Sequence, residues 1–293
     1  MIDLALELFP MPACRICDEC GTELPANAPE GLCPKCLINV ELEAGQGAGP
    51  VTRHRVPIRS PNRAFPEIRA LMMELDHIFI CTAVGAIEAA ECLTRAGLNE
   101  GTPNTHPGQG TANRRFFFRN AYLELLWVND AAEAQSAVVR PTYLWERWSG
   151  RNSGACPFGF GFRPSIQHSK PLFGTWDYRP PYLPDPLKIQ IGNHAKNIAE
   201  PLLFFLPFAR RPESIEPAKG QPLDHPAGVR EITGVVLTSL GAERPSPELK
   251  AIVDSGLLRC HSGTEYLIEL CFNREEQRKK FDCRPVLPLI IKF

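Results

Sequence analysis

Four cysteines near the start of the chain constrain its folding more than any other feature. They form two C-x-x-C pairs separated by 12 residues: Cys17, Cys20, Cys33 and Cys36. Two pairs at this separation are typical of a tetrahedral site in which four thiolates hold one zinc ion. A segment this short has no core of its own, so metal binding would supply its folding energy. The spacing therefore predicts a zinc ribbon over residues 14–42.

The register of this site has an alternative, because Cys14 makes a third C-x-x-C pair with Cys17. Gly21 follows only the Cys17/Cys20 pair, and glycine suits the tight turn of a metal knuckle because it tolerates positive φ. A disulfide is the other use of paired cysteines. Residues 1–13 carry two acidic and no basic side chains, unlike a secretory signal. We therefore expect a reducing, cytoplasmic location, where zinc is favoured over a disulfide.

The whole chain has the composition of an ordinary globular protein. Of its 293 residues 44% are hydrophobic, and the formal net charge is -1. This near-neutral charge argues against strong nucleic-acid binding. No apolar run approaches the length of a membrane span, so no membrane partner is expected. The expected partners are a small-molecule ligand, a protein that docks on the zinc ribbon, and a second copy in a homodimer.

A linker and one large domain follow the cysteines. Residues 43–64 are rich in glycine, proline and arginine and poor in apolar side chains, which predicts a flexible linker. From residue 65 to residue 293 the pattern predicts an α+β domain. Helices are expected at 86–96, ended by Gly97, and after Ser246, with Pro247 at the first helical position and Gly256 at the end. Strands are expected at 75–83, 111–118, 122–128, 158–163, 202–208, 232–239, 257–259, 265–272 and 286–293.

The early and late parts of this domain share a pattern. The strand 75–83 leads into a helix that ends Ala-Gly-Leu, and the strand 232–239 leads into a helix that ends Ser-Gly-Leu. This predicts an internal duplication of a β-α-β-β unit, with the two strands in corresponding places. Paired modules of this kind can leave a cavity between them.

Several short motifs occur in the order seen in one known family. They are Leu75-Asp76-His77, Gly110-Thr111-Ala112-Asn113-Arg114, Tyr122-Leu123-Glu124-Leu125, and the late pair His225-Pro226-Ala227-Gly228 and Ile232-Thr233-Gly234-Val235. Residues 66–293 thus resemble the glyoxalase-like branch of the vicinal oxygen chelate superfamily (glyoxalase, bleomycin resistance and dioxygenase proteins). The resemblance implies paired β-α-β-β-β modules that form a cupped sheet around the active site. The N-terminal part is similar to zinc ribbons fused to diverse bacterial domains.

Strand alternation identifies a candidate active site. It places Ile78 and Ile80 under the helix 86–96, and it turns His77 and Glu124 toward the cup. In metal-dependent members of the superfamily, the matching positions supply a His and a Glu ligand, so the resemblance implies catalytic roles for His77 and Glu124. An imidazole and a carboxylate can hold a divalent ion with open positions for substrate oxygens. The alternative is that the two side chains only hydrogen-bond each other in a polar cavity.

The second module weakens the metal site. Gly234 aligns with His77 and cannot ligate a metal, and Glu269 aligns with Glu124. His106, in the loop 105–110, is a further candidate for binding metal or substrate. Asn113 and Arg115 share one face of their strand, and a cup-facing Arg115 would bind a substrate carboxylate or carbonyl.

Three functions remain open at this level. The first is a glyoxalase-like enzyme that acts on a small oxygenated molecule, with lyase or isomerase chemistry and a divalent metal in the cup. The second is a non-catalytic small-molecule binding protein. The absence of a metal ligand at Gly234 favours this function. The third is an adaptor whose zinc ribbon docks a partner. The expected cofactors are a structural zinc ion and, for the enzyme, the divalent ion in the cup.

Overall fold

The computed structural model describes residues 15–16, 23–24, 72–166, 169–215, 220–240 and 242–293. The chain divides into two units, Met1–Arg53 and His54–Phe293. In the first unit, β1 (Arg15–Ile16) and β2 (Glu23–Leu24) pair antiparallel. Cys17, Cys20, Cys33 and Cys36 lie outside the described residues, as does the predicted linker. The zinc ribbon, its metal and the boundary at residue 64 therefore remain predictions.

The second unit begins with a module of four strands and one helix. Its elements are β3 (Met73–Cys81), α3 (Ile87–Arg95), β4 (Asn104–His106), β5 (Thr111–Phe117) and β6 (Tyr122–Val128). The strand order is β4-β5-β6-β3, and β3 runs parallel to β6. All of these elements except β4, which was not expected, lie close to the positions predicted from the sequence.

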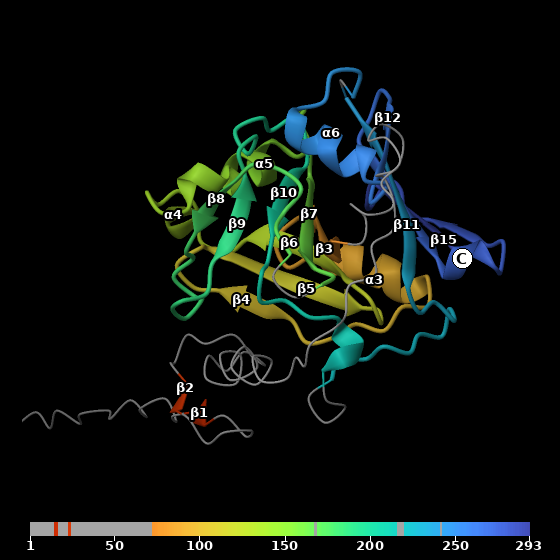
Figure 1. The fold of residues 1–293 in the computed structure, drawn as a ribbon. Helices are drawn as coiled ribbons and strands as arrows, with labels where there is room; N and C mark the ends of the chain where they lie inside the picture. Colours follow the sequence, from red (N-terminus) through yellow and green to blue (C-terminus); the bar gives the residue numbers. More distant parts are fainter. Residues whose placement is uncertain (1–14, 17–22, 25–71, 167–168, 216–219, 241) are drawn as a thin grey trace, which may run out of the picture. The chain divides into compact units, whose positions relative to one another are not determined.

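A second set of four strands completes an eight-stranded sheet. Its strands are β7 (Phe158–Pro164), β8 (Thr175–Tyr178), β9 (Ile189–Gly192) and β10 (Leu202–Phe205). Their order, β7-β10-β9-β8, with β7 parallel to β10, repeats that of the first module, and the two halves join where β3 pairs antiparallel with β7 (Figure 1). The described residues between β7 and β8 contain no helix.

The last part of the chain forms a separate five-stranded sheet. It contains β11 (Ile232–Ser239), α6 (Pro247–Asp254), β12 (Arg259–Ser262), β13 (Leu267–Phe272), β14 (Lys280–Asp282) and β15 (Leu289–Lys292). Its order is β12-β11-β13-β15-β14, with β12 parallel to β11. The predicted correspondence of 75–83 with 232–239 is therefore wrong. The strand that matches β3 is β7, because β7 joins β3 in one sheet and has its own parallel neighbour, β10.

Short helices connect these strands. They are α4 (Ala131–Ala134), α5 (Leu144–Gly150) and the 3-10 turns η1 (Arg140–Thr142), η2 (Pro212–Ser214) and η4 (Asn273–Glu275). The N-terminus of α6 is capped as expected, since Ser246 Oγ accepts a hydrogen bond from the backbone N–H of Leu249. Among the described residues, no helix is both long and apolar enough to cross a membrane.

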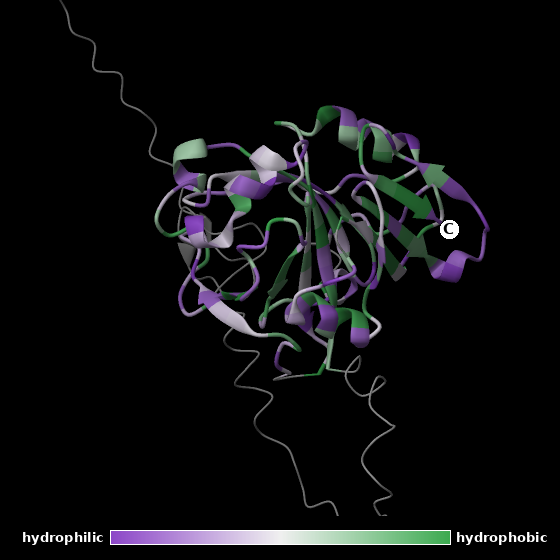
Figure 2. Ribbon diagram, turned by 90° about the horizontal axis from the view of Figure 1, so that it is seen from above, coloured by the Kyte–Doolittle hydropathy of each residue, from purple (hydrophilic) through white to green (hydrophobic). Residues whose placement is uncertain are grey.

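The eight-stranded sheet has a different apolar core on each face. On one face, Ile78 and Ile80 pack with α3 and with the C-terminal sheet, as the alternation predicted. On the other, which we call the inner face, Phe79 and Phe204 pack with side chains from β6, β8, β9 and α5. Both faces of β3 are therefore buried, and Figure 2 accordingly shows mostly apolar strands in the middle of this unit. This arrangement leaves few positions for polar side chains, and those few define the candidate site.

Candidate functional site

A β-bulge places two neighbouring polar side chains on the inner face. The register of β3 against β7 shifts between Leu75 and His77, so Asp76 is an extra residue in the strand. Leu75 packs on the side of α3, and so does Ile78, which shows that the alternation changes phase at the bulge. Asp76 and His77 can therefore both lie on the inner face, although neighbouring residues of a regular strand point to opposite faces.

His77 lies between two carboxylates. Its Nδ1 is 2.6 Å from Oδ1 of Asp76, and its Nε2 is 3.4 Å from Oε2 of Glu124. Glu124 is on β6, next to Phe79 of β3, and its Oε1 accepts a hydrogen bond of 2.5 Å from the Asn113 amide. We call Asp76, His77, Asn113, Tyr122 and Glu124 the Glu124 cluster. The structure thus brings His77, Glu124 and Asn113 together, as the sequence led us to expect.

Behind the cluster, Arg163 of β7 neutralises Asp76. Its Nη1 is 2.9 Å from Oδ2 of Asp76, and its Nε is 2.9 Å from Oε1 of Glu74. Glu74 also binds Arg211, which lies between β10 and η2. Burial alone would raise the pKa of Asp76, but the hydrogen bond and charge of His77 and the charge of Arg163 outweigh it and lower that pKa. Asp76 is therefore an ionised anchor for His77 at neutral pH.

Aromatic rings hold the imidazole of His77 in place. The ring of Tyr122 stacks on it at 4.4 Å between centroids, and the edge of Phe204 approaches it at 5.1 Å. Opposite His77 in the strand pairing is Gly161, where a Cβ atom would lie 2.9 Å from Cε1 of His77. The neighbouring inward position, Gly159, leaves space for the ring of Phe79. The glycines of β7 therefore make room for side chains from β3 and β10.

Phenols and a second histidine surround the accessible side of Glu124. The ring of Tyr182 lies 4.7 Å from that of His106, whose Nδ1 is 2.8 Å from Oγ1 of Thr111. Burial raises the pKa of Tyr122 and Tyr182, and the charge of Glu124 adds to this effect, so both phenols stay protonated. Burial lowers the pKa of His106 to about 4, so its imidazole is neutral at pH 7.

Arg115 has a different role from the one expected. Its Nε donates a hydrogen bond of 2.9 Å to the carbonyl of Thr102, and its guanidinium lies 5.0 Å from the centre of the Phe117 ring. Arg115 pairs with Glu124 across β5 and β6, which places it on the same face. Within the described part of the chain, only its Nε has a hydrogen-bond partner, and the guanidinium has five N–H donors in all.

The donors around His77 do not form a complete metal site. His77 and Glu124 supply one nitrogen and one carboxylate, while the inward positions on β7 and β10 are glycine and Phe204. Across the part of the chain that the structure describes, no group of three or more His, Cys, Asp or Glu side chains could hold a metal ion. Among these side chains, His77 and Glu124 alone would offer a divalent ion two protein ligands.

The two positions that we aligned with this site lie elsewhere. Gly234 and Glu269 belong to β11 and β13 of the five-stranded sheet, and Glu269 pairs with Lys292 at 2.6 Å. The expectation that they face the cup is wrong, because the second half of the cup is built from β7 to β10.

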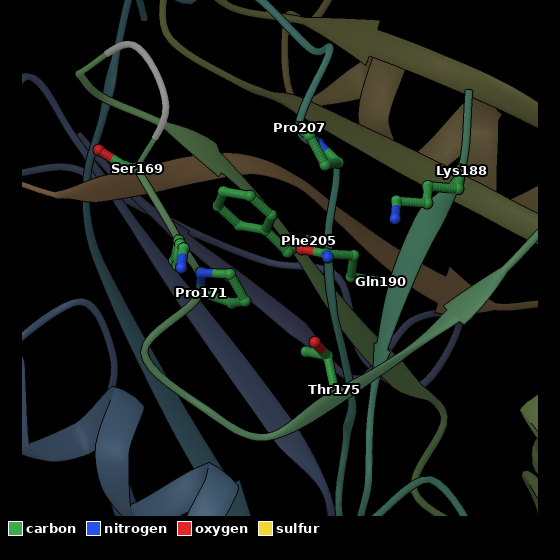
Figure 3. A pocket seen from close by; sticks show the side chains of 8 residues that line it. Ser169, Pro171, Thr175, Lys188, Gln190, Phe205 and Pro207 are labelled. Carbon is green, nitrogen blue, oxygen red and sulfur yellow. The ribbon is translucent and has the colours of Figure 1, made fainter. Parts of the chain in front are cut away.

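Two cavities of the second unit are lined by other residues. One, of about 440 Å³, opens over β8, β9 and β10, where Thr175, Lys188, Gln190 and Phe205 line it (Figure 3). The other, of about 420 Å³, lies between the segment 140–146 and β8. His77 and Glu124 line neither of them, and each is only 5% exposed. Tyr122, Arg115 and His106, near the Glu124 cluster, are half-buried.

Three residues of this site were missed in the sequence. Asp76 was given no role, and regular alternation, which does not foresee a bulge, would place it on the face opposite His77. Arg163 ends a strand whose partner was unknown, and Tyr182 lies in a proline-rich segment with no periodic pattern. The Gly-Phe-Gly-Phe-Arg run of 159–163 was the available signal, because glycines at alternate positions indicate close approach of another side chain.

With this geometry in place, the chain can be compared with known proteins. Residues 75–154 match the glyoxalase-like domain family. This region includes β3 to β6, so the match supports a relation to the vicinal oxygen chelate superfamily for the half of the sheet that carries His77 and Glu124. No curated protein matches the chain.

Two solved structures show similarity at 11% sequence identity. A hypothetical protein from Staphylococcus aureus has a TM-score of 0.46, with 75% of this chain and 99% of that chain covered. A xylose isomerase-like TIM barrel/4-hydroxyphenylpyruvate dioxygenase fusion protein has a TM-score of 0.40, with 81% of this chain and 40% of that one covered.

Proposed function

We propose that the glyoxalase-like part of the chain binds a small oxygenated molecule at the Glu124 cluster, without a divalent ion held there. The observation that carries this proposal is the row Asp76–His77–Glu124, which is charged, buried and backed by Arg163. Buried charges are costly unless they are paired, and clefts that contain such groups are candidate functional sites. Elsewhere the inner face is largely apolar.

The groups around Glu124 suit a ligand that has both hydroxyl and carbonyl oxygens. Glu124 is an acceptor for a hydroxyl group, while the guanidinium of Arg115 and the phenols of Tyr122 and Tyr182 are donors for carbonyl oxygens. Asn113 holds Glu124 in a fixed orientation through its 2.5 Å hydrogen bond. His106 is neutral and contributes a hydrogen bond rather than a charge.

Catalysis is a second candidate function, and the anchoring of His77 favours it. Asp76 binds Nδ1 of His77 and leaves Nε2 directed at Glu124, so the two groups can share a proton. A proton taken from a carbon next to a ligand carbonyl would pass to this pair and return from it, with the phenols stabilising the enolate oxygen. The metal-dependent form of the chemistry is not part of this proposal.

The predicted zinc ribbon supports a third role beside these two. A ribbon over residues 14–42 would dock a protein partner while the larger unit binds its ligand, which is the adaptor function. We propose it only as an addition to ligand binding, because the larger unit carries a polar site of its own.

The test uses the full chain and two matched variants. Glu124→Gln removes the charge at the site, and Glu269→Gln removes a strand carboxylate from the other sheet. Ligand-observed NMR with a panel of small 2-oxo and 2-hydroxy acids should find binders that lose about tenfold in affinity in Glu124→Gln, because a hydrogen bond to a charged group is lost, and that keep their affinity in Glu269→Gln.

Two results would contradict the proposal. A panel in which no compound depends on Glu124 would argue against ligand binding at this cluster. Calorimetric titration with Mn²⁺ alone should give the same result for wild type and both variants. Stoichiometric Mn²⁺ binding that disappears only in Glu124→Gln would show that a divalent ion is held there after all.

A further inference from the structure

The second cavity of the larger unit is an open hollow of the surface with polar and aromatic walls. Its volume is about 420 Å³, within the range of small-molecule sites. Three segments that are distant in sequence contribute its walls, and the polar and aromatic side chains that line it are Arg140, Tyr143, Glu146, Trp176, Asn193 and Lys196. None of them belongs to the Glu124 cluster.

Charged side chains of both signs line this cavity without pairing. Within the described residues, the exposed Arg140 and Lys196 and the half-buried Glu146 form no ion pair, whereas Lys188 pairs with Asp177 at 2.6 Å. Oε2 of Glu146 is buried and has no hydrogen-bond partner within the described part of the chain. A buried carboxylate oxygen without a donor is costly, so a donor from a ligand would be strongly favoured.

The backbone at the cavity wall is strained. Tyr143 has a φ of 56°, in the left-handed region that bulky residues rarely adopt. Its backbone is fixed there, since its N–H bonds to the carbonyl of Arg140 and its carbonyl accepts from the N–H of Arg147. Strained residues gather at ligand clamps and active sites. The strain, the unpaired Glu146 and the cavity are three separate observations at one place.

We propose that this cavity binds a zwitterionic ligand of the amino-acid class. The ammonium group donates to Glu146, the carboxylate is bound by Arg140 or Lys196, and the side chain lies against Trp176 and Tyr143. A ligand with both charges would explain why the cations Arg140 and Lys196 and the anion Glu146 share one cavity without pairing with each other. An aromatic side chain on the ligand gains most from the indole and phenol rings. This proposal does not depend on the function of the Glu124 cluster.

The experiment compares L-phenylalanine with its two single-charge analogues, phenethylamine and 3-phenylpropanoate, by calorimetric titration of the full chain. L-Phenylalanine should bind at least about tenfold more tightly than either analogue, because each analogue leaves one charged wall unpaired. Glu146→Gln should weaken L-phenylalanine binding by about tenfold or more, with little effect on 3-phenylpropanoate. Glu91→Gln, at an exposed position on α3, is the matched control and should bind like wild type.

Each of the other outcomes overturns the proposal. Equal binding of phenethylamine would identify a cation site, and equal binding of 3-phenylpropanoate an anion site. If titration with L-phenylalanine up to about 10 mM gives no heat of binding, the cavity does not bind amino acids with useful affinity. If Glu146→Gln does not fold, as judged by circular dichroism, Lys196→Gln at an exposed position replaces it. Unchanged L-phenylalanine affinity in both Lys196→Gln and Arg140→Gln would equally refute the carboxylate contact.

Discussion

The glycine opposite His77 offers a sharp test of how the candidate site is packed. Replacing Gly161 with alanine would place a Cβ atom 2.7 Å from Cε2 of Phe204 and 2.9 Å from Cε1 of His77. Ordinary contact begins at 3.4 Å, so the Phe204 ring would have to move by about 0.7 Å. Phe204 is 6% exposed and His77 is 5% exposed, and each packs against other rings, so neither can move freely.

The expected cost follows from overpacking of a filled core. Extra methyl groups in such cores typically destabilise a protein by about 1–3 kcal/mol. We expect Gly161→Ala to lose about 2 kcal/mol of unfolding free energy, which lowers the ratio of folded to unfolded chains about 30-fold. The displacement would also disturb the stacking of His77 on Tyr122, so any activity that depends on His77 should fall as well.

Urea unfolding followed by tryptophan fluorescence measures this loss in the full chain. All four tryptophans, Trp127, Trp145, Trp148 and Trp176, lie in the larger unit, so the signal reports on that unit. The matched control is Gly234→Ala on β11, where a Cβ atom would lie 3.4 Å from Cβ of Cys271 and meet no severe clash. Its stability should stay the same or rise by up to about 0.5–1 kcal/mol, because alanine is favoured over glycine within strands.

The comparison of the two variants can refute the reasoning. If Gly161→Ala is as stable as Gly234→Ala, the inner face has free space beside His77 and is not close-packed. The binding site would then have to be reconsidered as a larger cavity, with His77 free to turn.

Two further predictions concern Asp76 and the cysteines. Asp76→Asn should destabilise the larger unit by about 3–5 kcal/mol near pH 7, because it removes a buried partner of Arg163. The pKa of Asp76 is lower in the folded state than its ordinary value of 3.8, so its contribution is present above about pH 4 and is lost as pH falls through the folded-state pKa. The gap between wild type and variant in urea unfolding should therefore narrow in acid, and a constant gap from neutral pH to about pH 3 would contradict the pairing. Cys20→Ser with Cys33→Ser should abolish zinc binding, measured by elemental analysis, while the fluorescence unfolding curve of the larger unit stays unchanged; stoichiometric zinc in the double variant would disprove the ribbon.

Much of the fold followed from local sequence patterns. The strand 232–239 and the capped helix after Ser246 were located correctly, because an alternating apolar run and a Ser-Pro start are local signals. The apolar side of β3 was also correct from Ile78 onward. These features depend on neighbouring residues only, so no knowledge of the tertiary structure was required.

The pairing of the halves could not be predicted in the same way. The sequence pattern of β11 and α6 resembles that of β3 and α3, yet β7 is the partner of β3. The described residues between β7 and β8 contain no helix that would mark β7 as the start of a module. The bulge at Asp76 is likewise set by pairing across the sheet. His77 and Glu124 were found because β3 pairs regularly from His77 onward and β6 pairs regularly around Glu124. Arg163 and Tyr182 reach the site only through long-range contacts.

The antiparallel joint between β3 and β7 limits where the gene can be divided. The stretch that matches the glyoxalase-like family, residues 75–154, stops before β7 begins at Phe158. A fragment with those boundaries would expose β3 as a free edge, in which the N–H and carbonyl groups that face β7 are unpaired while those that face β6 stay paired. A free edge of this kind can pair with a strand of another molecule. In the intact chain β7 occupies it in antiparallel pairing. The fragment would therefore be prone to self-association through β3, and an expression boundary placed after β10 or later avoids this hazard.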